Sequence, residues 1–260
     1  VVLSTNGPLA TIIDVQGTPE QSHRGFLFAP GQFGTNTRAA VLDGFTIRNG
    51  FMGTPSEPEK AAAKALPSGG DRVQHDLSGA GLMFRLGASA TVRNCIIENC
   101  FSEFTGGGIG VEFASNPRFE HVTVRGCRAD IQGGGITVET LGLGEFVDCV
   151  ITGNSAPNGG GLAAHENTTL QGCVIADNSA VRGGGIDMSF PASITIQNSI
   201  LWNNCASDSG AQVYVDPAIS LSGFVQIACS AIDTLGIRDL GGVIEFQQSN
   251  VFDDPQFCLP

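Results

Sequence analysis

Long apolar runs, positive charge and large amphipathic aromatic side chains are all scarce in this chain of 260 residues. No run of about 18 apolar residues occurs, so the sequence predicts no helix that spans a membrane. The chain has 13 lysines and arginines against 25 acidic residues, which gives a net charge of −12. A nucleic acid or an anionic membrane requires a basic surface, so we expect neither as a partner.

The eight cysteines show neither a CxxC pair of the zinc type nor the spacing of a disulfide framework. Five of them recur at equivalent positions of a repeat, and these are Cys95, Cys100, Cys127, Cys149 and Cys173. Phenylalanine and valine occupy the position of Cys95 in other copies, which indicates an inward position that a small apolar side chain can fill. We therefore expect these cysteines to be structural, and any disulfide to involve Cys205, Cys229 or Cys258.

Glycine is abundant, with 36 residues, but it does not follow the period of collagen. Four triplets are each followed by an aliphatic residue: Gly106–Gly108, Gly133–Gly135, Gly159–Gly161 and Gly183–Gly185. Counted on the third glycine (108, 135, 161 and 185), successive copies lie 27, 26 and 24 residues apart, and a weaker copy around Gly81 lies 27 residues earlier. A period of this size predicts a solenoid, which we take to be a single domain over residues 1–260.

The segments between the triplets are rich in β-branched residues and alternate with a period of two, as strands require. Ile97, Val124 and Ile151 fall in one apolar, inward column. No helical pattern separates the strands, so each strand is expected to stack in parallel on its own copy. The sequence thus predicts an all-β parallel β-helix with three strands per rung and a right-handed winding.

Two further columns have structural interpretations. Asn154, Asn178 and Asn204 superpose at a corner, where stacked amides can hydrogen-bond along the axis as a ladder. The outward column that begins with Arg48, Glu98 and Arg125 alternates in charge, which favours ion pairs between neighbouring rungs.

The range 51–78 does not fit the repeat, and we interpret it as an inserted loop on the flank of the solenoid. Within it, residues 56–59 resemble a capping box and residues 59–66 predict a short helix that Pro67 ends. Insertions of this kind often shape a binding face. The first four residues look like an internal strand, so we expect that an N-terminal cap is missing, as in a processed exported protein.

Three stretches resemble the right-handed parallel β-helix family of bacterial secreted and surface proteins: residues 42–50, 154–162 and 198–204. The resemblance covers nearly the whole chain except the insertion, and it implies a secreted or cell-surface protein. Pectate lyases, polygalacturonases, alginate lyases and adhesin-type repeats belong to this family. The chain lacks the paired-aspartate and His-Gly motifs of polygalacturonases and the Arg-x-Pro-x-x-Arg element of pectate lyases. The resemblance therefore favours the fold without assigning an activity.

The densest group of ionisable residues follows the triplets. Stacking in register would place Arg85, Glu112, Glu139 and His165 in a line at steps of about 4.8 Å. Two adjacent carboxylates raise the pKa of one of them unless a cation compensates, which suits acid–base chemistry. The spacing fits a retaining glycosidase or, with a basic neighbour, uronic-acid elimination. The alternative is a solvated ladder that neutralises its own charges.

Other residues are candidates for binding substrate or a cation. Asp187, Tyr214 and Asp216 lie on the same glycine-led strands, and Trp202 lies on another strand of the repeat. Tyrosine and tryptophan can stack on sugar rings. Calcium is the one cofactor that we consider, because Asp187, Asp216 and the terminal 253–254 pair offer the oxygen ligands that it prefers.

These patterns predict a protein that binds or processes an extended polysaccharide on its glycine-led face. If it is an enzyme, a polysaccharide lyase or glycoside hydrolase is expected. A non-enzymatic adhesin or surface-layer spacer is the alternative. We expect the site immediately after the triplets, with the glycines leaving the approach to those strands unobstructed.

Overall fold

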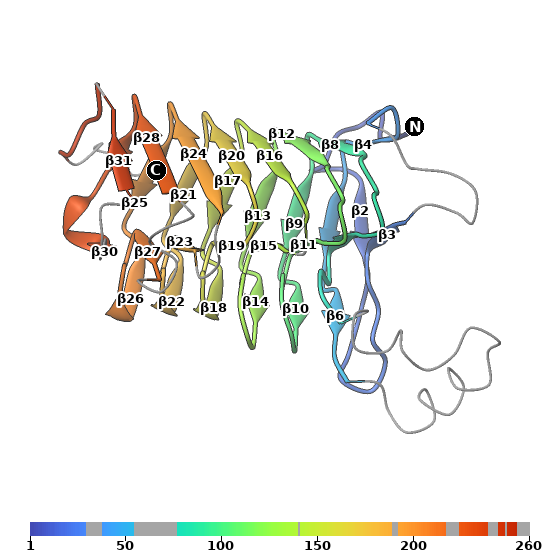
Figure 1. Cartoon of the computed structure of the whole chain (residues 1–260). Coiled ribbons are helices and arrows are strands. Elements are labelled where there is room, and N and C mark those ends of the chain that lie inside the picture. The colour runs from blue at the N-terminus through green and yellow to red at the C-terminus, as the bar shows by residue number, and fades with distance from the viewer. Residues whose placement is uncertain are drawn as a thin grey trace.

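The computed structural model describes residues 1–29, 38–54, 77–139, 141–188, 192–216, 224–238, 244–247 and 249–253. Over these residues the chain winds into an elongated coil, with the N-terminal strands at one end of the rod and the C-terminal strands at the other (Figure 1). The single helical segment in this part of the chain is η2 (Thr234–Gly236), so none of the described helices is long and apolar enough to cross a bilayer.

Four parallel sheets run along the rod, and we number them in the order in which one coil visits them. Sheet 1 contains β1 (Val2–Leu3), β4 (Val41–Asp43), β8 (Thr91–Arg93), β12 (Arg118–Glu120), β16 (Gly144–Val147), β20 (Thr168–Gln171), β24 (Ser193–Gln197), β28 (Phe224–Ala228) and β31 (Ile244–Phe246). Sheet 2 contains β2 (Ile12–Asp14), β5 (Thr46–Arg48), β9 (Ile96–Glu98), β13 (Thr123–Arg125), β17 (Val150–Thr152), β21 (Val174–Ala176), β25 (Ile200–Trp202) and β29 (Ala231–Ile232). 

Sheet 3 contains β6 (Phe51–Met52), β10 (Phe101–Ser102), β14 (Arg128–Ala129), β18 (Ser155–Asn158), β22 (Ser179–Arg182) and β26 (Cys205–Ser209). Sheet 4 contains β3 (Phe26–Phe28), β7 (Leu82–Phe84), β11 (Ile109–Val111), β15 (Ile136–Val138), β19 (Leu162–Ala164), β23 (Ile186–Met188), β27 (Val213–Val215) and β30 (Ile237–Arg238). The parallel β-helix is confirmed, but a regular coil holds four short strands and not the three expected. Sheet 3 was missed because its first strands have only two residues, too few to show an alternating pattern.

The strand register confirms the predicted columns. Ile97 pairs with Val124, which pairs with Ile151, and all three are buried. Aromatic side chains stack inside the rod in the same way, with ring centroids 4.4 Å apart for Phe28 and Phe84 and 4.8 Å apart for Phe119 and Phe146. One continuous apolar core results, which is the main stabilising contribution in a solenoid whose coils contact only their neighbours.

The predicted asparagine ladder is present at the corner between sheets 2 and 3. The Nδ2 group of Asn154 donates to Oδ1 of Asn178 over 3.0 Å, and Asn178 donates to Oδ1 of Asn204 over 3.0 Å. Each Oδ1 also accepts a backbone N–H from the preceding coil, so these buried amides satisfy both the backbone and each other. The same corner in the earlier coils holds Cys100 and Cys127, which are buried thiols as expected.

The cysteines and the charged column also follow the sequence interpretation. The seven cysteines in the described part of the chain are free thiols, and Cys205 and Cys229 are exposed. Cys258 lies outside the described residues. On the outer face of sheet 2, Arg48 contacts Asp14 at 2.8 Å and Arg125 contacts Glu98 at 2.6 Å. Exposed pairs of this kind each contribute only about 0.2–1 kcal/mol.

The regular coil extends into the range 51–78 that the sequence predicts as an inserted loop. Phe51 and Met52 form β6, which pairs in parallel with β10, and the ring of Phe51 packs on Phe101 at 5.3 Å. The predicted capping box and helix of residues 56–66 lie outside the described residues.

The strands of sheet 3 and the glycine triplets that follow them form a thin two-layered ridge along the rod, which we call the fin. Sheet 3 leads outward to the tips of narrow arches (β14, β18 and β22 in Figure 1), and each triplet leads back to sheet 4. The first glycine has a positive φ, as in Gly133 at 63°, and turns the chain. The middle glycine packs directly on the backbone: a Cβ on Gly134 would lie 2.3 Å from the carbonyl oxygen of Ser155 and 2.6 Å from that of Gly160. The fin therefore has no room for a side chain between its two layers.

Gly134→Ala is expected to destabilise the fold by about 3 kcal/mol or more, because its Cβ meets backbone atoms that cannot move without breaking the coil. Gly153→Asn is the matched control. Gly153, unlike Gly134, has a positive φ, but its Cβ would meet nothing nearer than 3.9 Å, and Asn99 and Asn203 adopt this conformation in other coils. Chemical denaturation of both variants would check the prediction, and equal unfolding midpoints would contradict it.

Candidate functional site

The predicted row of ionisable residues exists in the predicted order. Each residue directly follows a strand of sheet 4, and its backbone N–H donates to the strand before it: Glu112 to Phe84, Glu139 to Val111 and His165 to Val138. Arg85 precedes Glu112 at the end of β7, where its guanidinium lies 5.8 Å from the ring of Phe113. The two carboxyl groups and the imidazole therefore occupy three successive coils along the rod axis.

The approach to sheet 4 is not unobstructed, which corrects the sequence interpretation. The neighbouring column was expected to face outward, yet Thr137 and Asp187 are 0% exposed and Tyr214 is 7% exposed. The positive φ of the first glycine explains this burial, because it places the residue before each triplet alongside sheet 4. These covering residues are Ser78, Thr105, Gln132, Asn158 and Arg182.

Three of the covering residues, Ser78, Thr105 and Gln132, hydrogen-bond to the ionisable row. Nε2 of Gln132 donates to Oε1 of Glu139 over 2.6 Å and lies 3.5 Å from Nδ1 of His165. Thr105 hydrogen-bonds to Glu139 and Ser78 to Glu112, and the hydroxyls of Ser78 and Thr105 lie 2.8 Å apart. We call these six residues, Ser78, Thr105, Glu112, Gln132, Glu139 and His165, the Glu112 network.

Sequence reasoning missed Ser78, Thr105 and Gln132. A signal was available, since the position before the first glycine is polar in every copy from Ser78 to Arg182. It also missed Arg24, whose Nε and Nη2 donate to the carbonyl oxygens of Gly79 and Ser78 and so fix one end of the network.

Burial and the neighbouring carboxyl make Glu112 a weak acid. Glu112 is 5% exposed. Its pKa is raised to about 7, first by the loss of hydration and second by the charge of Glu139. The hydrogen bond from Ser78 and the charges of Arg85 and Arg24 lower the pKa of Glu112 only in part. Near neutral pH this carboxyl can therefore hold or release a proton.

The other two titratable groups of the network are also perturbed. Burial raises the pKa of Glu139, although the hydrogen bonds from Gln132 and Thr105 oppose this effect. Burial lowers the pKa of His165 to about 4, so its imidazole is neutral at physiological pH. A neutral imidazole presents one donor and one acceptor beside the two carboxyl groups.

The residues predicted to bind substrate do not form one group. Asp187 and Tyr214 are register partners in β23 and β27, and the guanidinium of Arg182 lies 5.3 Å from the ring of Tyr214. Asp216 follows β27, and its N–H donates to Met188. Trp202 is separate, because it ends β25 in sheet 2, on another face of the rod. No group of three or more potential ligands that could hold a metal ion occurs among the described residues, so the calcium interpretation gains no support there.

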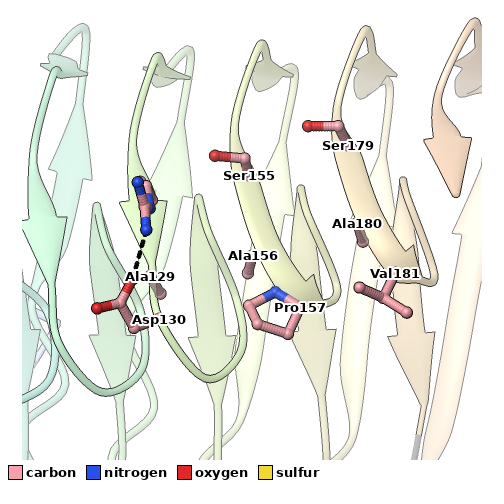
Figure 2. A pocket seen from close by; sticks show the side chains of 9 residues that line it. Ala129, Asp130, Ser155, Ala156, Pro157, Ser179, Ala180 and Val181 are labelled. Carbon is pink, nitrogen blue, oxygen red and sulfur yellow. Dashed lines mark hydrogen bonds and ion pairs between the residues drawn. The ribbon is translucent and has the colours of Figure 1, made fainter. Parts of the chain in front are cut away.

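A hollow on the outer face of sheet 3 contains none of the predicted site residues. It is open and shallow, with a volume of about 390 Å³, and three coils line it, including Arg128, Ser155 and Ser179. Arg128 pairs with Asp130 at 2.8 Å, and the two serine hydroxyls point the same way (Figure 2).

Comparison with known families identifies the fold class. The family model described as right handed beta helix region matches residues 72–224, more than half of the chain, and the chain belongs to this family. This confirms the right-handed winding expected from the sequence. No curated protein and no solved structure gives a significant match. The match defines a right-handed β-helix protein, and because one fold hosts many activities, its function depends on its own side chains.

The raised pKa of Glu112 makes a prediction about stability. Between pH 4.5 and about 7 the folded state keeps a proton that the unfolded state releases, so stability falls as the pH rises through this window. Above about pH 7 the buried Glu112 is fully ionised, and the resulting loss of folding stability amounts to roughly 3 kcal/mol. Glu112→Gln removes the charge, so the variant should gain stability relative to the original protein on going from pH 4.5 to pH 8.

Chemical denaturation of both proteins at the two pH values would measure this difference. Glu120→Gln is the control, because Glu120 pairs with Arg118 on the half-exposed face of sheet 1. A stability difference between Glu112→Gln and the original protein that is the same at both pH values would contradict the prediction.

Proposed function

We propose that this β-helix protein binds an extended polysaccharide along the Glu112 network and cleaves it by acid–base chemistry. The observation that carries the proposal is the pair of neighbouring carboxyls, Glu112 and Glu139, both with raised pKa values and each in its own coil. A linear polymer that lies along the rod axis would pass Arg85, Glu112, Glu139 and His165 in succession, of which Arg85 and Glu139 are partly exposed and Glu112 and His165 are buried.

The two carboxyl groups suit complementary roles. Glu112, with a pKa of about 7, retains a proton that it can donate to a glycosidic oxygen. Glu139 is half-buried and therefore more accessible, and its carboxylate would act as the base or nucleophile on the opposite side of the scissile bond. Gln132, which donates to Glu139, would hold that carboxylate in position. Since such polymers lie outside cells, the proposal includes secretion or display on the cell surface.

A non-enzymatic surface spacer is the second candidate. It is favoured by the way in which the network satisfies its own polar groups, since Gln132 contacts both Glu139 and His165. In this alternative, the rigid rod is the functional element, and the Glu112 network serves only to cover the outer face of sheet 4.

Turnover of a panel of neutral and acidic polysaccharides distinguishes the two candidates. We expect Glu112→Gln and Glu139→Gln each to lower the rate of cleavage by about 100-fold or more, since a positioned acid or base contributes that much. Binding should change little, because glutamine keeps the shape of the side chain. The rate should also fall above pH 7, as Glu112 loses its proton.

Glu120→Gln on sheet 1 is the control and should leave turnover unchanged. Unchanged turnover in both network variants would refute the acid–base roles. Failure of the original protein to bind or cleave any polymer of the panel would favour the spacer.

A further inference from the structure

A groove on the outer face of sheet 1 has no part in the Glu112 network. Its volume is about 400 Å³, within the range of small-ligand sites. The floor is formed by Glu145, Thr169 and Thr195, which are register partners in β16, β20 and β24. The three floor residues span two strand spacings, or about 10 Å along the axis.

The wall of the groove contains Asn116, Leu143 and Asn167, which precede strands of sheet 1, and Ser193, the first residue of β24. Hydrogen bonds fix both amides in one orientation. Oδ1 of Asn116 accepts from Nη2 of Arg38 over 2.8 Å, and Oδ1 of Asn167 accepts from the backbone N–H of Ser193 over 2.9 Å. Each Nδ2 group is therefore left as a donor, and within the described ranges no hydrogen bond engages it.

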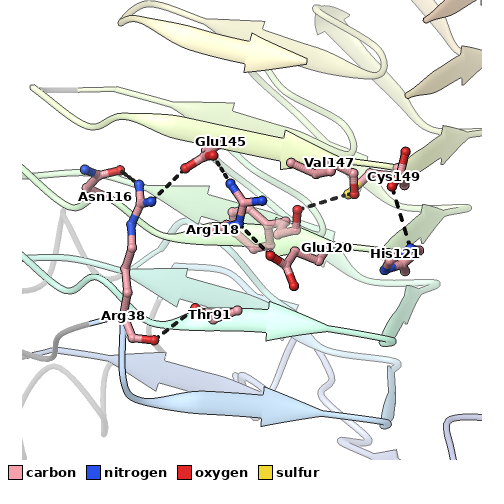
Figure 3. A network of polar contacts seen from close by, with 11 residues as sticks. Arg38, Thr91, Asn116, Arg118, Glu120, His121, Glu145, Val147 and Cys149 are labelled. Carbon is pink, nitrogen blue, oxygen red and sulfur yellow. Dashed lines mark hydrogen bonds and ion pairs between the residues drawn. The ribbon is translucent and has the colours of Figure 1, made fainter. Parts of the chain in front are cut away.

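The charges of the groove neutralise each other. Nη1 of Arg38 contacts Glu145 at 2.8 Å, and Arg118 forms an ion pair with the same carboxylate. Arg118 also pairs with Glu120 (Figure 3). Arg38 reaches this carboxylate from the other side of β8, where its carbonyl oxygen accepts from Thr91. A ligand in the groove would thus meet a guanidinium that is already paired, and a carboxylate that repels anions.

We propose that this groove binds a short neutral oligosaccharide. The amide and hydroxyl groups of Asn116, Asn167, Thr169, Ser193 and Thr195 offer donors and acceptors to sugar hydroxyls, and Glu145 adds a strong acceptor. Leu143, which is 40% exposed, and the threonine methyl groups supply apolar surface for the C–H faces of a sugar ring. The paired charges exclude a preference for uronic acids. This proposal does not depend on the function proposed for the Glu112 network.

Calorimetric titration of the full chain with neutral trisaccharides tests the proposal. The panel contains cellotriose, maltotriose, xylotriose and laminaritriose, with trigalacturonate as the acidic comparison. We expect at least one neutral trisaccharide to bind and the acidic one to bind more weakly. Thr195→Val keeps the size of the side chain but removes the hydroxyl, and Asn167→Asp keeps the acceptor for Ser193 but removes the Nδ2 donor. Each variant should weaken binding by about tenfold, the effect of one lost hydrogen bond.

Thr152→Val on the outer face of sheet 2 is the matched control and should bind like the original protein. Unchanged melting temperatures would show that the groove variants are folded. Three results would overturn the proposal: no neutral trisaccharide binds at about 10 mM, the acidic trisaccharide binds more tightly, or binding survives both groove variants and therefore occurs elsewhere.

Discussion

Parallel pairing in register is the constraint on which this structure depends, because it places every side chain beside its counterpart one coil away. A side chain that interacts favourably with an identical neighbour can therefore occupy the same position in successive coils. The amides of Asn154 and Asn178 bond to each other, and the rings of Phe119 and Phe146 stack. Charged side chains must alternate in sign, as Glu98 and Arg125 do on sheet 2. The same rule therefore explains the core, the corner ladder and the ion pairs.

Glu112 and Glu139 break this rule. They place two acids in successive coils, Glu112 buried and Glu139 half-buried. Burial raises the pKa of both, and their hydrogen bonds, together with the charges of Arg85 and Arg24 near Glu112, oppose this effect only in part. A leucine or threonine at either position would fit the repeat without raising a pKa. Local choices that oppose the fold are concentrated at functional sites, where the cost of the strain or charge is offset by the stability of the rest of the molecule. The long apolar core of the rod can offset such a penalty.

Much of the fold follows from the sequence because the triplets fix the register. Once Gly108, Gly135 and Gly161 are aligned, the order Arg85, Glu112, Glu139, His165 is determined, and the structure has it. The covering of that row could not be predicted in the same way. It depends on where the chain points after a positive φ and on a backbone contact within the fin, and neither leaves a periodic pattern. The burial of Asp187 was missed for this reason. The separate position of Trp202 could be predicted from the sequence, because Trp202 shares a column with Arg48 and Glu98.

The shortening of the repeat from 26 residues to 24, between Gly161 and Gly185, has a local cause in the turn between sheets 4 and 1. Three residues lie between Glu112 and Asn116, and three lie between Glu139 and Leu143, but only one lies between His165 and Asn167, the counterpart of Leu143. Two residues are thus absent from the turn between sheets 4 and 1 in this coil. Glu166 is the only residue between the Glu112 network and the groove there, and its carboxylate accepts the backbone N–H of Leu141 in the preceding turn. In a solenoid such a change remains confined to one corner, because the strands on either side keep their register. Turn length can therefore shape the surface of this protein while the columns that hold the core stay unchanged.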